Sequence, residues 1–364
     1  MNELKIPIQN AYVYTYHKYC YTLMEGMHIQ ITPWHNERGY TFMSSPCFCY
    51  STCAKDIKNN YCDFKDNPID LLLSQKRLAF LNKVIVDRDF SSCVGCPKFA
   101  MRDDSGFWYE DDFKFLFGEK TGTLHFDMFK NRHISTVFPR GLFLNLGSCC
   151  NLKCRTCRND FITKHWDLTD DEINQFAYIA RHCDLLALGG DGEFFMNPNY
   201  TRILNQDLRS DSQLCKIMIM TNGTMFTEKR WNLLPDTSKS LIHEIKITLD
   251  AATPETYEKV RGPVGWKMLM KNMPFILDLK KQYGFELAST YTISKYNVQD
   301  VEKFYDFARG LGFDNVMFQF ARDLFHPETG KGEDFKIPDD KHDEIMNYLL
   351  KRREEEGFAR LVIE

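Results

Sequence analysis

The stretch LFLNLGSCCNLKCRTC, residues 142–157, joins a short apolar run to three cysteines at fixed spacing. Cys150, Cys154 and Cys157 follow the pattern C-x3-C-x2-C. Iron–sulfur clusters are usually held by four cysteine thiolates, so a compact set of three leaves one iron of a four-iron cluster open to another ligand. An open iron on a reducing cluster can bind a reactant, whereas a cluster whose four irons are all closed by thiolates is suited to electron transfer alone. Three neighbouring cysteines are also compatible with a zinc site.

Apolar, strand-like runs alternate with helical patterns from this stretch onward. Such alternation predicts right-handed βαβ units and a parallel sheet. The first intervening helix should begin at Thr169, because Thr169 and Glu172 have the spacing of a capping box. The expected strands are 142–146, 184–190, 216–222, 244–250, 286–293 and 315–320.

The composition narrows the class of function. The chain has 364 residues, of which 43% are apolar and 26% charged, as in a globular protein with room for two domains. Its net charge of −4 argues against a nucleic-acid partner. We find no run of about 18 apolar residues and no export signal, which argues against a membrane partner. Thirteen cysteines without such a signal indicate metal or redox chemistry in a reducing cytoplasm.

The cysteine triad resembles the signature of the radical S-adenosylmethionine (SAM) superfamily. Three later segments are similar to that family in the same order: GGDGE (189–193), MTNG (220–223) and TLDAATPETYEKVRG (248–262). The resemblance implies an α/β fold, with a partial (β/α)6 TIM-like barrel over residues 136–364. It also implies that the triad holds a [4Fe–4S] cluster whose open iron chelates SAM. SAM cleavage would then give a 5′-deoxyadenosyl radical that abstracts hydrogen from the substrate.

Further site residues follow from the resemblance, at the carboxyl ends of the strands. Glycines let the backbone approach the bound methionine moiety, and a carboxylate can accept from its ammonium group. Either Asp191 or Glu193 has the second role. For each position a turn or a strand-end cap is the structural alternative. The cofactor-binding candidates are Gly189, Gly190, Asp191, Glu193, Asn222, Asp250, Thr292 and Ser294.

Residues 1–135 form a different, cysteine-rich region, for which we expect a small α+β module and a linker. The run HNERG at 35–39 fits a hairpin turn, and a helix should begin at Asn67-Pro68. The order of cysteine, glycine-bearing hairpin, cysteine, helix and CxxC resembles the auxiliary-cluster half of a SPASM or twitch module. In most characterised relatives that module follows the barrel, whereas here it precedes it.

The module resemblance implies a second, auxiliary [4Fe–4S] cluster with four closed thiolates. Cys49, Cys53 and Cys62 are competing ligands, of which Cys49 could replace Cys47, and zinc is the alternative to the cluster. The implied ligands are Cys20, Cys47, Cys93 and Cys96.

The resemblance implies an enzyme that modifies a peptide or protein by crosslinking, thioether formation or epimerisation. Dehydrogenation or epimerisation of a carbohydrate or small alcohol is the runner-up. A metal-binding scaffold without catalysis is a third reading, although the triad and the strand-end motifs are all intact. The implied redox partner is an electron donor such as flavodoxin or ferredoxin.

Overall fold

The structure is a computed structural model that describes residues 4–5, 7–8, 11–14, 27–33, 37–45, 62–87, 89, 100–102, 107–108, 127, 131, 138–157, 161–209, 216–321, 324–326, 331–333, 335–357 and 361–363. The chain divides into two compact units. The first comprises Met1–Gly147, Trp166–Leu188 and Arg202–Ile217. The second comprises Ser148–His165, Gly189–Thr201 and Met218–Glu364.

The first unit is built around strands that pair in the order β10-β9-β4-β5-β6. Strands β10 and β4 both run parallel to β9, and β5 and β6 continue the sheet antiparallel. These elements are β4 (Met27–Pro33), β5 (Tyr40–Ser45), β6 (Asp63–Lys65), β9 (Gly141–Asn145) and β10 (Leu185–Leu188). All described side chains of β9 and β10 are buried, as expected for strands covered on both faces.

The remaining elements of the first unit are mostly short. The strands form a two-stranded sheet, β1-β8, and a three-stranded sheet, β2-β3-β7. These elements are β1 (Leu4–Lys5), β2 (Pro7–Ile8), β3 (Ala11–Tyr14), η2 (Pro68–Leu73), α2 (Gln75–Leu81), η3 (Asn82–Val86), β7 (Ala100–Arg102), β8 (Phe107–Trp108) and α5 (Asp170–Ala180).

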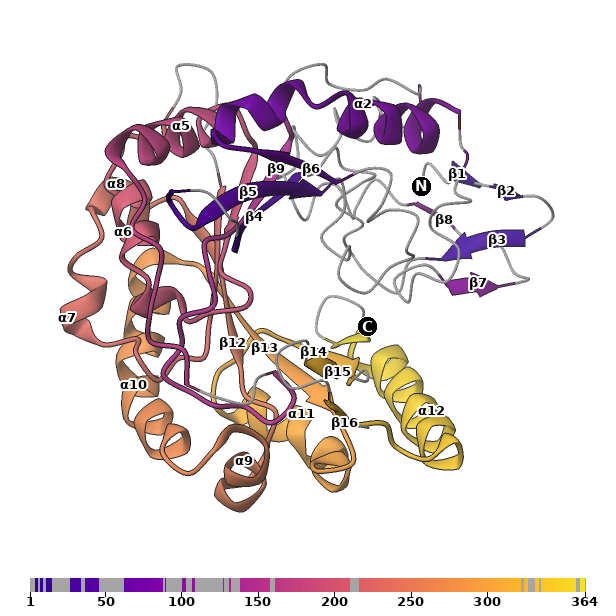
Figure 1. Cartoon of the computed structure of the whole chain (residues 1–364). Coiled ribbons are helices and arrows are strands. Elements are labelled where there is room, and N and C mark those ends of the chain that lie inside the picture. The colour runs from indigo at the N-terminus through magenta and orange to yellow at the C-terminus, as the bar shows by residue number, and fades with distance from the viewer. Residues whose placement is uncertain are drawn as a thin grey trace. The chain divides into compact units, whose positions relative to one another are not determined.

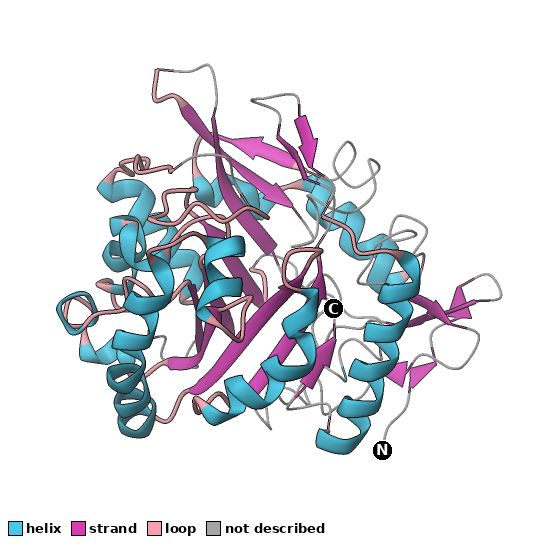
Figure 2. Ribbon diagram, turned by 90° about the horizontal axis from the view of Figure 1, so that it is seen from below, coloured by secondary structure: helices cyan, strands magenta, loops and turns pink. Residues whose placement is uncertain are grey.

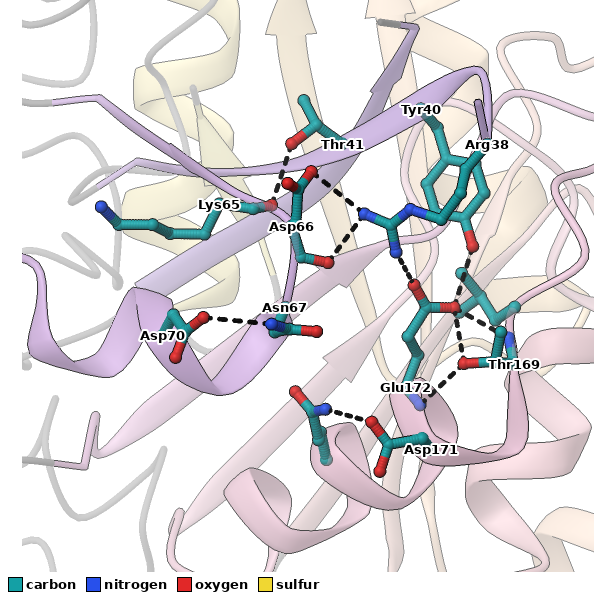
Figure 3. Close-up of polar contacts among 12 residues, drawn as sticks. Arg38, Tyr40, Thr41, Lys65, Asp66, Asn67, Asp70, Thr169, Asp171 and Glu172 are labelled. Carbon is teal, nitrogen blue, oxygen red and sulfur yellow. Dashed lines mark hydrogen bonds and ion pairs between the residues drawn. The ribbon is translucent and has the colours of Figure 1, made fainter. Parts of the chain in front are cut away.

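The predicted hairpin and capping box are both present and are linked to each other (Figure 3). Arg38, in the turn between β4 and β5, donates to the Glu172 carboxylate and, at 2.8 Å, to the carbonyl oxygen of Asp66. The Tyr40 hydroxyl donates to the same carboxylate at 2.8 Å, and so does the backbone N–H of Thr169. One buried carboxylate therefore caps α5 and fixes the hairpin.

The helix expected from Asn67-Pro68 begins at Pro68 but is divided in two. A 3₁₀ turn, η2, ends at Leu73, and Ser74 then leaves the helical conformation with ψ 113°. The Ser74 side chain accepts from the N–H of Arg77 at 3.2 Å and so starts α2 as its N-cap.

The second unit contains the parallel order β17-β14-β13-β12-β11 (Figure 1). Helices lie beside the strands of the sheet (Figure 2). Among them, α11 packs on β14, and α12 packs beside β17. Its strands are β11 (Lys216–Thr221), whose first two residues belong to the first unit, β12 (Ile242–Thr248), β13 (Glu286–Ile293), β14 (Asn315–Phe320), β15 (Leu324–His326), β16 (Lys331–Glu333) and β17 (Leu361–Ile363). Its helices are η5 (Phe194–Met196), α6 (Pro198–Leu204), α7 (Glu228–Trp231), α8 (Asp236–Lys239), α9 (Pro254–Arg261), α10 (Gly265–Tyr283), η6 (Val298–Asp300), α11 (Val301–Gly310) and α12 (Asp339–Glu356).

All the strands expected from residue 142 onward are present, and the α/β fold class is confirmed. The sequence did not indicate that β4 pairs with β9 or that β17 pairs with β14. The first of these pairings joins residues on either side of the predicted boundary at 135. The assignment of residues 1–135 and 136–364 to separate domains stays a prediction. No helix in the described part of the chain is long and apolar enough to cross a membrane.

Candidate active site

The cysteine triad lies on a folded loop of the second unit. Cys150 and Cys154 are buried, whereas Cys157 is exposed. The N–H of Cys150 donates to the carbonyl of Ile162 at 2.6 Å, and the N–H of Cys157 donates to the carbonyl of Cys154 at 3.0 Å. These bonds bring the three thiols into one loop that is closed at its base.

Two N–H groups point at the sulfur of Cys150. The backbone N–H of Leu152 lies 3.4 Å from Sγ, and the side-chain amide of Asn222 lies 3.6 Å from it. The Asn222 amide also donates to Asn151, and the Asn222 oxygen accepts from the Thr224 hydroxyl at 2.6 Å. This network fixes Asn222, a predicted site residue, so that its N–H groups stabilise negative charge on the Cys150 sulfur.

Two of the predicted motif segments contact the cysteine loop through the backbone. The N–H of Glu193, after β10, donates to the carbonyl of Cys149 at 2.8 Å. The N–H of Arg155 donates to the carbonyl of Val260, in the last turn of α9, at 2.7 Å. The predicted motifs after β10, β11 and β12 therefore gather around the loop, as expected for a site at the carboxyl ends of barrel strands.

Asp191 and Glu193, which the sequence left as alternatives, have opposite environments. Asp191 is exposed, whereas Glu193 has 0% exposure. The Glu193 carboxylate accepts from the Thr221 hydroxyl at 2.6 Å and from the N–H of Asn222 at 2.7 Å. Burial raises the pKa of Glu193, and the hydrogen bonds from Thr221 and Asn222 oppose that shift. Glu193 thus holds the end of β11, and Asp191 is the carboxylate that a ligand can reach.

Gly189 and Gly190 form the turn that joins β10 to the segment with Asp191 and Glu193. Their φ values are 119° and 133°. A Cβ at Gly189 would lie 2.7 Å from the carbonyl oxygen of Met220. Only glycine therefore fits at 189, because of both the backbone conformation and the close approach of β11.

Asp250 is buried, and its carboxylate binds within the protein. Oδ2 accepts from Arg261 at 2.5 Å, and Oδ1 accepts from the N–H of Thr292 at 2.6 Å. Asp250 has a φ of 58°, the left-handed region that non-glycine residues seldom adopt. Arg261 was missed from the sequence, although it lies in the segment after Asp250 that we had singled out.

The last two predicted site residues, Thr292 and Ser294, are also bound to other groups of the protein. The Thr292 hydroxyl accepts from the Gln319 amide at 2.8 Å. Ser294 is fully buried, and its hydroxyl donates to Asn297 Oδ1 at 3.0 Å. Asn297 in turn donates to the carbonyl of Asp250 at 2.9 Å. Ser294 and Asn297 hold the turn after β13, and their predicted role at a ligand is untested.

The triad fits a [4Fe–4S] cluster by its donor chemistry. Soft thiolates are the usual ligands of such clusters, and none of the three thiols is joined in a disulfide. Burial raises the pKa of the Cys154 thiol to about 11, and the nearby positive charge of Arg261 opposes the shift. Among the described residues, no three His, Cys, Asp or Glu side chains converge on a single-ion site.

The predicted ligands of the auxiliary cluster, Cys20, Cys47, Cys93 and Cys96, lie outside the described residues, as does Cys49. The hairpin that leads towards Cys47 is described and is fixed by Arg38. The second cluster therefore stays a prediction.

Comparison with known proteins agrees with this geometry. Residues 144–308 match the family model of the Radical SAM superfamily. This part of the chain is similar to the Radical SAM superfamily, as its motifs predicted. The matched residues run from β9 to α11 and include the triad and every predicted cofactor-binding residue.

A curated relative, the AdoMet-dependent heme synthase of Methanosarcina barkeri, is 25% identical over 227 residues, which is 60% of this chain and 60% of the relative. SuiB of Streptococcus suis bound to S-adenosylmethionine is 12% identical, with a TM-score of 0.47, over 92% of this chain and 72% of that one. The anSMEcpe structure with bound AdoMet and Kp18Cys peptide is 17% identical, with a TM-score of 0.47, over 61% of this chain and 62% of that one.

Proposed function

We propose that this radical SAM protein is an enzyme that abstracts hydrogen from a carbon of a peptide or protein substrate. The observation that supports this reaction is the position of the thiol triad among three strand ends, where the side-chain amide nitrogen of Asn222 lies 3.6 Å from the Cys150 sulfur. The choice of a peptide follows the resemblance of residues 15–100 to SPASM and twitch modules.

In this proposal Cys150, Cys154 and Cys157 hold the cluster. When bound, the cluster and SAM supply a 5′-deoxyadenosyl radical, the species that removes hydrogen from the substrate. Asn222 and the N–H of Leu152 stabilise the Cys150 thiolate. Asp191, which is exposed, accepts from the ammonium group of SAM.

Three fully or nearly buried residues have positioning roles. Glu193 holds β11 so that Asn222 faces Cys150. Asp250 and Arg261 neutralise each other and join the end of β12 to α9 and β13. These contacts join the strand ends to one another and hold the exposed groups in place around the cysteine loop.

The test is anaerobic reconstitution with iron and sulfide, followed by reduction in the presence of SAM. The reaction predicts 5′-deoxyadenosine from the wild type and none from a Cys150/Cys154/Cys157→Ala triple variant. About eight irons in the wild type, falling to about four in the variant, would also establish the auxiliary cluster, since each cluster carries four irons. A wild type that contains iron but forms no 5′-deoxyadenosine would make the protein a scaffold.

The substrate class has its own test. Peptides encoded beside the gene, and sugars, are offered to the reconstituted protein with SAM in deuterated water, and mass spectrometry follows both product and 5′-deoxyadenosine. Modification of a peptide supports the proposal. Turnover of a sugar or small alcohol, with no change to any peptide, would replace it with the carbohydrate reading.

A further inference from the structure

Two cations face one tyrosine ring beside the cysteine loop. The guanidinium of Arg155 lies 4.4 Å from the centre of the Tyr296 ring. The ammonium of Lys295 lies 5.3 Å from the same centre. Arg155 stands between two triad cysteines, and Lys295 lies in the turn after β13, so both cations border the candidate active site within the second unit.

Backbone hydrogen bonds hold the two residues that carry the cations, and a second aromatic ring packs against Tyr296. The N–H of Arg155 is bonded to the carbonyl of Val260 at 2.7 Å, and the N–H of Lys295 to the carbonyl of Phe335 at 3.1 Å. The Tyr296 ring meets the Phe335 ring edge-on at 6.2 Å. Cations stacked on a held aromatic face lose less freedom when they bind a third group, because their side chains are already oriented.

The two cations differ from Arg261 in their ion pairing. Arg261, another arginine near the triad, is paired with Asp250 at 2.5 Å. Within the described part of the chain, neither Arg155 nor Lys295 forms an ion pair with a carboxylate. Both side chains are exposed, so a ligand can reach them. Two like charges held on one ring repel each other, and an anion between them removes that repulsion.

We propose that Arg155 and Lys295, which both lie against the Tyr296 ring, form a subsite for a carboxylate group of the substrate. The ligand carboxylate accepts from the guanidinium and the ammonium together. The proposal rests on the proposed function for the position of the reacting carbon, and it adds that the substrate is acidic near that carbon. An acidic side chain of a peptide and a sugar acid share this chemistry.

Binding to the reconstituted, SAM-loaded protein tests the subsite without turnover. The probes are two matched pairs: a blocked peptide with a central glutamate and its glutamine counterpart, and glucuronate and glucose. At low salt the acidic member of one pair should bind about five- to tenfold more tightly than its neutral counterpart, as expected for charge-assisted contacts that are partly exposed. The pair that shows the preference identifies the source of the carboxylate.

The variants Arg155→Gln and Lys295→Gln should each reduce that preference to less than about twofold. Arg155 lies between predicted cluster ligands, so its variant is compared only after iron content and the EPR signal match the wild type. Lys295→Gln lies outside the loop and keeps the test valid if the first variant loses its cluster. Lys281→Gln, which removes an exposed charge from α10, is the matched control and should keep the preference.

Equal binding of the acidic and neutral members of both pairs would overturn the subsite. So would a preference that persists in both glutamine variants, or one that Lys281→Gln also abolishes. Loss of 5′-deoxyadenosine formation with the preference intact would refute the proposed reaction and leave the subsite standing, so the two failures are distinguishable.

Discussion

Replacing Arg261 with glutamine leaves the Asp250 carboxylate buried without its cation. The two side chains are 7% and 2% exposed, and their closest atoms are 2.5 Å apart. Removing one partner of a buried ion pair typically costs about 3–5 kcal/mol, because the remaining charge has been taken out of water without compensation. We expect a loss in this range from Arg261→Gln.

The reciprocal change separates the pair from the backbone strain at the same position. Asparagine tolerates the φ of 58° at residue 250 and still offers an oxygen to the N–H of Thr292. Asp250→Asn should therefore cost less than Arg261→Gln. The double variant should be more stable than the sum of the two single losses predicts, because neither charge then remains buried alone.

Native-state hydrogen exchange of the amides of β12 and β13 measures these losses in the second unit by itself. The control pair is Asp278–Lys281, whose side chains are 77% and 80% exposed at a distance of 3.6 Å. Neutralising either residue of that pair should change nothing measurable. A loss of less than about 1 kcal/mol for Arg261→Gln would refute the reasoning, because a sealed carboxylate cannot lose its partner at so small a cost.

Three further predictions concern single groups. Glu193→Gln places an N–H₂ donor against the donors Thr221 and Asn222. The local stability measured by hydrogen exchange of β11 should therefore fall by about 1.5–3 kcal/mol. An unchanged exchange rate would contradict this prediction. Asn222→Ala removes a donor from the Cys150 sulfur and should lower the midpoint potential of the reconstituted cluster by up to about 60 mV, read by EPR titration, whereas an equal or higher potential would show that the contact has no electronic effect. Burial, reinforced by Glu172, raises the pKa of Tyr40. The stability that this group contributes is therefore complete below about pH 10 and is lost as pH rises. Tyr40→Phe should flatten the decline of the unfolding free energy at alkaline pH, measured by urea unfolding, and Tyr178→Phe, at an exposed site, should not.

The strands were predictable because their physical cause is local. Parallel strands covered on both faces read as continuous apolar runs, and β9 and β10 are buried along their full described length. The hairpin at Arg38 and the capping box at Thr169 are likewise set by neighbouring residues. The pairing of β4 with β9 was not predictable, because their residues are far apart in the chain and no local signal specifies the partner.

The candidate site divides in the same way. The triad and the glycines follow from spacing and backbone chemistry, and the structure places them together. The sequence could not distinguish Asp191 from Glu193, because the two carboxylates are two residues apart and differ only in what surrounds them. Burial and the hydrogen bonds from Thr221 and Asn222 distinguish Glu193 from Asp191, and both are tertiary features.

Most strand-end side chains that a motif search selects are bound to other protein groups. Glu193, Asp250 and Ser294 are all less than 3% exposed and all have partners within the protein. They can therefore affect a ligand only through the groups that they position. Recognition of the substrate then falls to exposed groups at the same edge, and Arg155 and Lys295 are cations there that no described carboxylate neutralises. The buried ion pair at Asp250 strengthens this conclusion, because it holds the Arg261 side chain at 7% exposure, where a ligand carboxylate does not reach it.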